Sequence, residues 1–273
     1  MPTVAHLPRP DRDRLSTMGA LVLLAIGLVR VVSLPILPLE FAALGLLIRI
    51  EVNSAFVLIV LAATVTVAGA DWLARTHPRP PQGPSRLEPV IIPGLATLAA
   101  GAILTNVDPG PGLWIGLALA AGGLMAILVV EFAVIDPADP RREPASLGLT
   151  VLAQVLLTGV YFALFSLGVR AAFTAPLTFL ATTAVSWRLL RLRMPEAQPG
   201  VYAVAIGAAV AEVAWALYYW PLAPVQPALL LGLLAHLAIQ AVVAHVRKHL
   251  SGRRAAEYSV VAAFGLAAVL LLS

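Results

Sequence analysis

Residues 113–135 read LWIGLALAAGGLMAILVVEFAVI, and Glu131 is the only charged residue in this run. A helix of about 20 apolar residues is long enough to cross the hydrocarbon core of a bilayer. The run is continuously apolar, whereas the strands of a membrane β-barrel alternate between apolar and polar residues over about ten positions. The stretch therefore predicts a transmembrane helix.

The same composition extends along the whole chain. Hydrophobic residues make up 60% and charged residues 12% of the 273 residues, compared with roughly 45–50% and 25% in soluble domains. We therefore predict an all-α fold, a polytopic transmembrane helix bundle of about nine helices, with eight as the alternative because the last one is short. A polar tail at 1–16 precedes a single transmembrane domain at 17–273. The predicted helices are 17–36, 53–73, 89–106, 113–135, 146–169, 175–192, 200–220, 228–246 and 258–273.

The basic residues indicate the orientation of these helices. Fifteen of the 18 Lys and Arg residues fall in segments on one side of the predicted membrane, whereas the opposite loops hold only Arg49 and Arg170. Lys and Arg in short loops collect on the cytoplasmic side. We therefore predict a multi-pass protein of the bacterial cytoplasmic (inner) membrane, with its N-terminus in the cytoplasm and its C-terminus outside. The basic composition then reflects topology, and no nucleic-acid partner is expected.

The segment 35–51, PILPLEFAALGLLIRIE, is apolar but carries Glu40, Arg49 and Glu51. It is too short for another full span. We expect either an interfacial or a re-entrant helix. The alternative is a ragged extension of the two flanking helices.

Two charged residues lie deep within predicted spans. Arg30 is thirteen residues beyond Thr17, and Glu212 is twelve beyond Gly200, so both lie about 18–20 Å from the cytoplasmic ends of their helices. A charge at that depth costs roughly 2.5–3.5 kcal/mol unless it has a partner or a water-filled cavity. An Arg30–Glu212 ion pair would fix two helices together, or the two groups could serve a transported ion.

Polar side chains also form stripes along predicted helices. His236 and Gln240 are one helical turn apart and point the same way. Gln154 belongs to a second stripe with Thr150 and Thr158. Such stripes could line a path for a solute, or they could hold helices together.

Nothing in the chain indicates catalysis. It contains no cysteine, which excludes disulfides and thiolate sites. We find no catalytic motif, so no catalytic residue, no metal ligand and no cofactor is predicted.

The C-terminal third carries a resemblance to a known family. EVAWALYYWPLAPVQPALLLGLLAHLAIQ (212–240) and GRRAAEYSVV (252–261) resemble an uncharacterised family of bacterial multi-pass membrane proteins. The resemblance is carried by Glu212, Trp215, Trp220, Pro221 and Glu257–Tyr258. It implies a membrane protein without implying any activity, and it marks Glu212 and Glu257 as positions to test.

Two functions from different classes remain open. The first is a non-catalytic structural or accessory subunit of a membrane complex, whose partners are the lipid bilayer and other membrane subunits. The alternative is a carrier for a small solute, lipid or ion, which would use Glu212, Arg30 and His236 in the bundle interior. An enzyme acting on lipid comes third, because only the 131–143 region gathers acidic residues near an interface.

Overall fold

The computed structural model describes most of the chain. The described residues are 10–28, 37–43, 46–52, 54–81, 87–136, 138–168, 170–194 and 198–247, together with positions 259, 260, 263, 265 and 267. They form two compact units, Met1–Ala145 and Ser146–Ser273. We describe each unit by itself, so the single-domain organisation stays a prediction.

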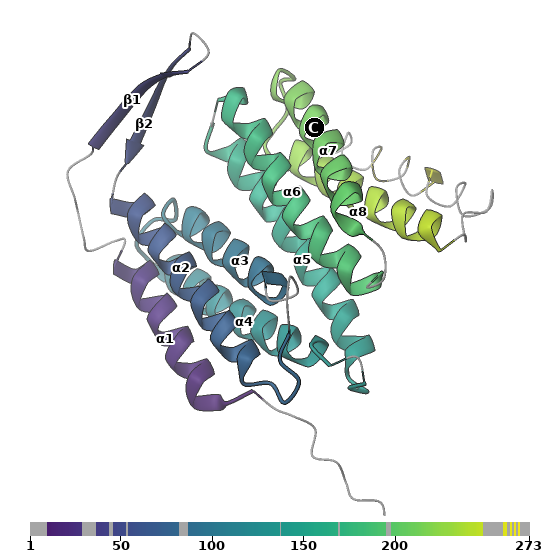
Figure 1. Cartoon of the computed structure of the whole chain (residues 1–273). Coiled ribbons are helices and arrows are strands. Elements are labelled where there is room, and N and C mark those ends of the chain that lie inside the picture. The colour runs from purple at the N-terminus through teal and green to yellow at the C-terminus, as the bar shows by residue number, and fades with distance from the viewer. Residues whose placement is uncertain are drawn as a thin grey trace, which may run out of the picture. The chain divides into compact units, whose positions relative to one another are not determined.

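The first unit contains four helices and a β-hairpin (Figure 1). Its elements are α1 (Arg12–Leu28), β1 (Leu37–Ala43), β2 (Leu46–Val52), α2 (Ser54–Arg75), α3 (Glu88–Leu104) and α4 (Pro111–Val134). The helices pack in the cycle α1–α2–α3–α4–α1, and α2 also contacts α4. This closed arrangement encloses one apolar core, to which all four helices contribute side chains such as Val22, Leu73, Val90 and Leu128.

The second unit contains the other four helices (Figure 1). They are α5 (Arg142–Ser166), whose first four residues belong to the first unit, α6 (Ala171–Arg193), α7 (Pro199–Tyr218) and α8 (Val225–Val246). Helix α6 packs most extensively on α7, and α8 contacts both. The α6–α7 contact is close because Gly207 lies against Thr183 and is too near the Phe179 carbonyl for a larger residue.

Local sequence signals account for where several helices begin. The Asp11 carboxylate accepts a hydrogen bond from the Asp13 N–H at 3.0 Å, so Asp11 acts as the N-cap of α1. Helix α1 consequently starts at Arg12, five residues before the predicted start. Proline lies in the first turn of α3, α4 and α7, where its missing N–H costs no helical hydrogen bond.

The prediction of a helix at 35–51 is wrong. Strands β1 and β2 form an antiparallel pair there, with Leu37 opposite Val52, Glu40 opposite Arg49 and Ala43 opposite Leu46. This register pairs the odd-numbered positions of β1 with the even-numbered positions of β2, and all of these positions are apolar residues in the sequence. The segment therefore has the period of two that favours a strand.

The remaining described elements are helices, as predicted. Helices α1 to α8 overlap the first eight predicted spans. The ninth prediction, 258–273, lies mostly outside the described residues, although the five described positions between 259 and 267 are helical. Five of the described helices are long and apolar enough to cross a membrane: α2, α4, α5, α7 and α8. This set is compatible with the predicted membrane protein.

Candidate functional site

Glu212 lies about two-thirds of the way along α7 and is exposed. Successive helical residues are rotated by about 100°, which places Glu212 roughly opposite Ala203, Val210 and Ala214. Those three residues are fully buried. The Glu212 side chain therefore belongs to the face of α7 that is turned away from the core of its own unit.

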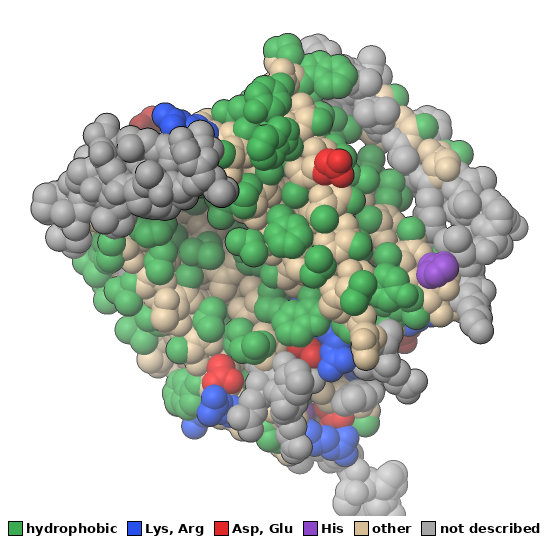
Figure 2. Space-filling view, turned by 45° about the horizontal axis from the view of Figure 1, so that its top comes forward, with side chains coloured by type: hydrophobic (Ala, Val, Ile, Leu, Met, Phe, Trp, Pro, Cys, Tyr) green, Lys and Arg blue, Asp and Glu red, His purple; other side chains and the backbone are tan. Residues whose placement is uncertain are grey.

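The residues around Glu212 form a continuous exposed strip. We define the α7 outer stripe as Val201, Ala205, Ala208, Glu212, Trp215 and Tyr219, all of which are exposed. They follow one another at spacings of four and three residues, so they occupy one side of the helix. Glu212 forms no hydrogen bond or ion pair with any residue that the structure describes. Hydrophobic side chains dominate the described surface visible in Figure 2.

A second group of polar residues joins α5, α6 and α8. The Arg193 guanidinium at the end of α6 donates to Gln240 Oε1 on α8 at 2.7 Å and approaches Thr150 Oγ1 on α5 at 3.4 Å. Gln240 Nε2 in turn lies 3.4 Å from His236 Nε2. Because Gln240 uses its oxygen to accept from Arg193, its amide N–H₂ faces the imidazole, which acts as the acceptor.

Sequence reasoning missed the part played by Arg193, which was counted only among the basic residues that flank the helices. The spacing of Arg193 in the sequence could have indicated this role. Arg193 follows Ser186 by seven residues, so both lie on nearly the same side of α6. The guanidinium Nη2 of Arg247 also donates a hydrogen bond to the Arg193 carbonyl at 2.8 Å. This bond connects the end of α6 to the end of α8.

Gln154 lies one helical turn after Thr150 and connects α5 to α8. Its amide nitrogen donates to the Gly232 carbonyl at 2.6 Å. Gly232 also lies directly against Thr158, so the two helices approach closely here. The Gln154 Oε1 atom is buried and has no hydrogen-bond partner in the part of the chain that the structure describes.

Helix α6 carries a line of buried hydroxyl groups at Thr178, Thr182 and Ser186. The Thr182 hydroxyl donates to the Thr178 carbonyl at 2.6 Å. Because its proton is used in that bond, the Tyr161 hydroxyl of α5 must donate to Thr182 Oγ1, at 2.6 Å. The hydroxyl oxygens of Thr178 and Ser186 are buried and form no hydrogen bond with any described residue.

In the first unit, the loop after α4 carries two ion pairs. Arg79 Nη1 lies 2.8 Å from Asp136 Oδ1, and Arg141 Nη2 lies 2.7 Å from Asp139 Oδ2. The Ala138 N–H and Arg79 lower the pKa of Asp136, and the Arg141 guanidinium lowers the pKa of Asp139. Both carboxylates are thus held in their charged form by neighbouring donors.

The acidic residues of this region do not assemble into a metal site. The described residues contain no cluster of three or more His, Cys, Asp or Glu side chains able to hold a metal ion. Glu131 is buried one turn before the end of α4, beside Leu73 and Phe132. His77 is also buried, with its ring edge-on to Phe132 at 4.8 Å between centroids.

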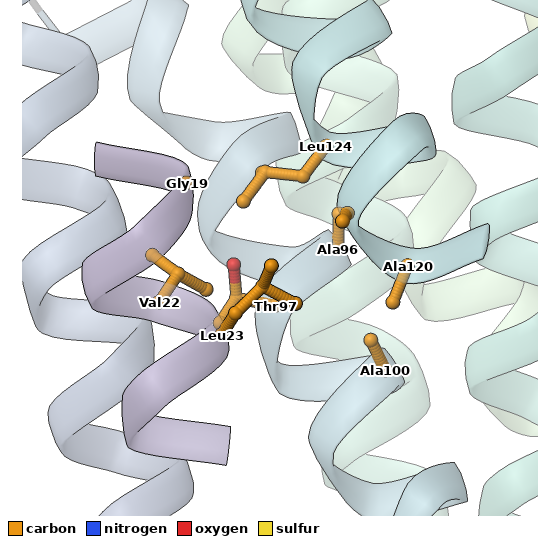
Figure 3. Close-up of a pocket in the computed structure, with 9 residues that line it drawn as sticks. Gly19, Val22, Leu23, Ala96, Thr97, Ala100, Ala120 and Leu124 are labelled. Carbon is orange, nitrogen blue, oxygen red and sulfur yellow. The ribbon is translucent and has the colours of Figure 1, made fainter. Parts of the chain in front are cut away.

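A small cavity lies between α1, α3 and α4 in the first unit (Figure 3). Val22, Leu23, Thr97 and Leu124 line it, and its volume is about 20 Å³. That is room for about one water molecule, which would need two or more polar partners. Among the described residues that line it, Thr97 is the only one with a polar side chain, and its hydroxyl already bonds to Thr66 Oγ1 and to the Pro93 carbonyl. This cavity is therefore a packing void rather than a solute site.

The predicted site residues are thus distributed over separate places. His236 and Gln240 lie together, and Gln154 bonds to the same helix one turn away. Glu212 lies on the outer face of α7. Arg30 lies outside the described residues, so its pairing with Glu212 stays a prediction.

Comparison with known proteins identifies a family without an assigned activity. No curated protein and no solved structure matches the chain. A family model covers residues 34–272, which extends the resemblance found in the C-terminal third to nearly the whole chain. The chain belongs to the family described as "Protein of unknown function (DUF5656)".

Proposed function

We propose that the protein is a non-catalytic structural subunit of a membrane complex. The observation that carries this proposal is the exposure of Glu212 about two-thirds of the way along α7. A carboxylate facing hydrocarbon at that depth costs several kcal/mol, which a neighbouring membrane chain removes by supplying a hydrogen-bonding partner. A carrier would instead turn its ionisable group toward the interior of the bundle.

The interior polar groups also support a structural role. Arg193 with Gln240, Gln154 with the Gly232 carbonyl, and Tyr161 with Thr182 each connect two different helices. Hydrogen bonds of this kind hold membrane helices together where packing alone gives little specificity. These bonds fix α5, α6 and α8 relative to one another, and α7 packs on α6 and α8 with its outer face free of them.

The proposed setting is the bacterial cytoplasmic membrane, with the N-terminus in the cytoplasm. This orientation is supported by the excess of Arg and Lys on one side of the predicted spans. The helix ends with Arg75, Arg193 and Arg247 then face the cytoplasm. The Trp215 and Tyr219 end of α7 faces the outer interface, where amphipathic rings are favoured.

The experiment is gentle extraction from native membranes followed by native mass spectrometry. The proposal predicts a species heavier than the 28.6 kDa chain with bound lipid, containing further protein chains in a fixed ratio. A Glu212→Leu variant is expected to lose those chains. A Val155→Leu variant, changed at an exposed position of α5, is expected to keep them. A wild-type species consisting of one chain with lipid alone would contradict the proposal.

The second candidate function is an ion or solute carrier. It is favoured by the buried oxygens of Thr178, Ser186 and Gln154, which have no hydrogen-bond partner among the described residues and could bind a polar solute. Its test is proton uptake into proteoliposomes loaded with a pH-sensitive dye. A carrier that uses the predicted charges requires uptake above that of protein-free vesicles, abolished by Glu212→Gln and by Arg30→Ala.

A further inference from the structure

We infer that one ordered water molecule is bound between α5 and α6, where it connects the Ser186 hydroxyl to the Gln154 side-chain oxygen. Both oxygens are buried and form no hydrogen bond with any residue that the structure describes. Buried polar groups in proteins are satisfied by a protein group or by a bound water molecule. The inference goes beyond the proposed function, because it assigns a binding site in the interior of the second unit.

Two hydrogen bonds fix the register of α5 against α6. Arg193 of α6 bonds to Thr150 of α5, and Thr182 of α6 bonds to Tyr161 of α5. The two bonds are eleven residues apart on each helix, from 150 to 161 and from 182 to 193, which is about 17 Å at 1.5 Å per residue. The two helices are therefore antiparallel, and the segments between the bonds have equal length.

Gln154 and Ser186 both lie within these segments. Gln154 comes one turn after Thr150, and Ser186 one turn after Thr182, so each is rotated by only about 40° from a residue that bonds to the facing helix. Counted from the level of the Arg193 bond, Gln154 lies about 6 Å along α5 and Ser186 about 10 Å along α6. An axial separation of about 4–5 Å is too long for a direct hydrogen bond, and it matches two bonds through one water molecule.

The hydrogen-bonding roles of the two side chains are complementary to water. Gln154 Nε2 donates to the Gly232 carbonyl at 2.6 Å, so reversing the amide would bring two acceptor oxygens together. The Gln154 Oε1 atom therefore needs a donor, and a water O–H supplies one. The Ser186 hydroxyl in turn donates its proton to the water oxygen.

The surrounding charges favour a neutral ligand over an ion. Residues 150–161 and 182–193 contain no Asp or Glu, so a cation bound between these segments would lack a counter-charge. An anion would face the Gln154 oxygen, which only accepts hydrogen bonds. The ligand must also be small, because Ser186 is fully buried.

The bound water adds a third polar connection between α5 and α6. It lies between the bond of Tyr161 with Thr182 and the bond of Arg193 with Thr150. It also occupies two of the three oxygens that favour a carrier, so a fixed water molecule at this site supports a structural role for the polar interior.

The first test is a double-mutant cycle, measured by reversible unfolding in mixed micelles of mild detergent and SDS. Gln154→Met removes the amide, including its bond to Gly232, and Ser186→Ala removes the hydroxyl. Because the two side chains share no direct bond, they are coupled only through the water molecule. We expect the double variant to be more stable than additivity predicts by about threefold in the unfolding equilibrium constant, the average for one interhelical hydrogen bond in a membrane.

Thr178→Val is the matched control for this cycle. It removes another buried hydroxyl of α6 that forms no hydrogen bond with a described residue, but Thr178 lies one turn beyond Thr182, outside the segment. We expect its effect to add to that of Gln154→Met without coupling. Additive effects for Ser186→Ala, or equal coupling for both hydroxyls, would overturn the inference.

The second measurement uses the unaltered chain, so it does not depend on the folding of a variant. Solid-state NMR of the protein in liposomes records magnetisation transfer from water protons to individual side chains. We expect transfer to Ser186 and Gln154 and none to Thr178. No transfer to Ser186 and Gln154 would overturn the inference, and so would transfer to all three, which indicates a file of mobile water along α6. Neither result bears on whether other chains are bound, so native mass spectrometry tests the proposed function separately.

Discussion

The contact between α6 and α7 should be sensitive to one methyl group at Gly207. In Gly207→Ala, the added Cβ would lie against Thr183 Oγ1, 3.2 Å from Thr183 Cβ and 3.0 Å from the Phe179 carbonyl oxygen. The Thr183 side chain could rotate, but the carbonyl belongs to the backbone of α6 and moves only with the helix. The two helices must therefore separate slightly.

The expected destabilisation follows from two opposing effects. Overpacking of a close contact costs about 1–3 kcal/mol, whereas replacing Gly by Ala within a helix contributes about 0.5–1 kcal/mol of stability. The net loss should be about 0.5–2 kcal/mol. In Gly159→Ala on α5, no atom lies within 4 Å of the new Cβ, so only the favourable effect applies.

The assay is reversible unfolding in mixed micelles of mild detergent and SDS, followed by tryptophan fluorescence. Gly207→Ala should unfold at lower SDS content than wild type, and Gly159→Ala at equal or higher content. The double variant Gly207→Ala with Thr183→Ala should recover part of the loss, because it removes the contact with the hydroxyl and leaves the one with the carbonyl. If Gly207→Ala is as stable as Gly159→Ala, the close packing of α6 on α7 described above is refuted.

Two further predictions follow from hydrogen bonds in the described residues. Tyr161→Phe should lower the free energy of unfolding by about 0.6 kcal/mol, and by at most about 1.7 kcal/mol, because it removes one buried hydrogen bond between α5 and α6. Unfolding in SDS measures this change, and an unchanged unfolding midpoint would contradict the prediction. Arg141 lowers the pKa of Asp139 below its ordinary 3.8, so the stability it contributes is present above pH 3.8 and is lost as the pH falls through the lower folded-state pKa. Asp139→Asn should therefore be less stable than wild type at pH 6, with the difference in unfolding temperature disappearing in strong acid; a constant difference would argue against it.

The length and continuity of the apolar runs were enough to predict the eight described helices. Some helices begin at other residues than predicted, and the residues responsible can be recognised in the sequence. Asp11 caps α1, and Pro111 occupies the first turn of α4, so both helices begin before their apolar runs do. If the N-cap and proline signals had been considered before hydropathy, the first residues of α1 and α4 would have been predicted correctly.

The β-hairpin was missed because a short apolar segment is ambiguous between helix and strand. The sequence LLIRIEV of β2 places Leu46, Ile48, Ile50 and Val52 at alternate positions, and its β-branched residues favour a strand. The open edges of a two-stranded sheet leave backbone groups unpaired, and these are unfavourable in hydrocarbon. We therefore expect the hairpin to lie outside the apolar core of a bilayer, whereas a re-entrant helix would have entered it.

The direction of Glu212 could not be predicted for a different physical reason. Its depth follows from counting residues, but its side of the helix depends on which face of α7 packs on α6. In a soluble helix the polar residues mark the outer face, whereas α7 is apolar all round and gives almost no such contrast. Both faces also carry small residues, for instance Gly207 on one and Ala208 on the other. The two faces differ at Gly207, where an added Cβ would lie 3.0 Å from the Phe179 carbonyl oxygen and against Thr183. Glycine thus allows the close approach of α6 to this face of α7, and Glu212 lies on the other face.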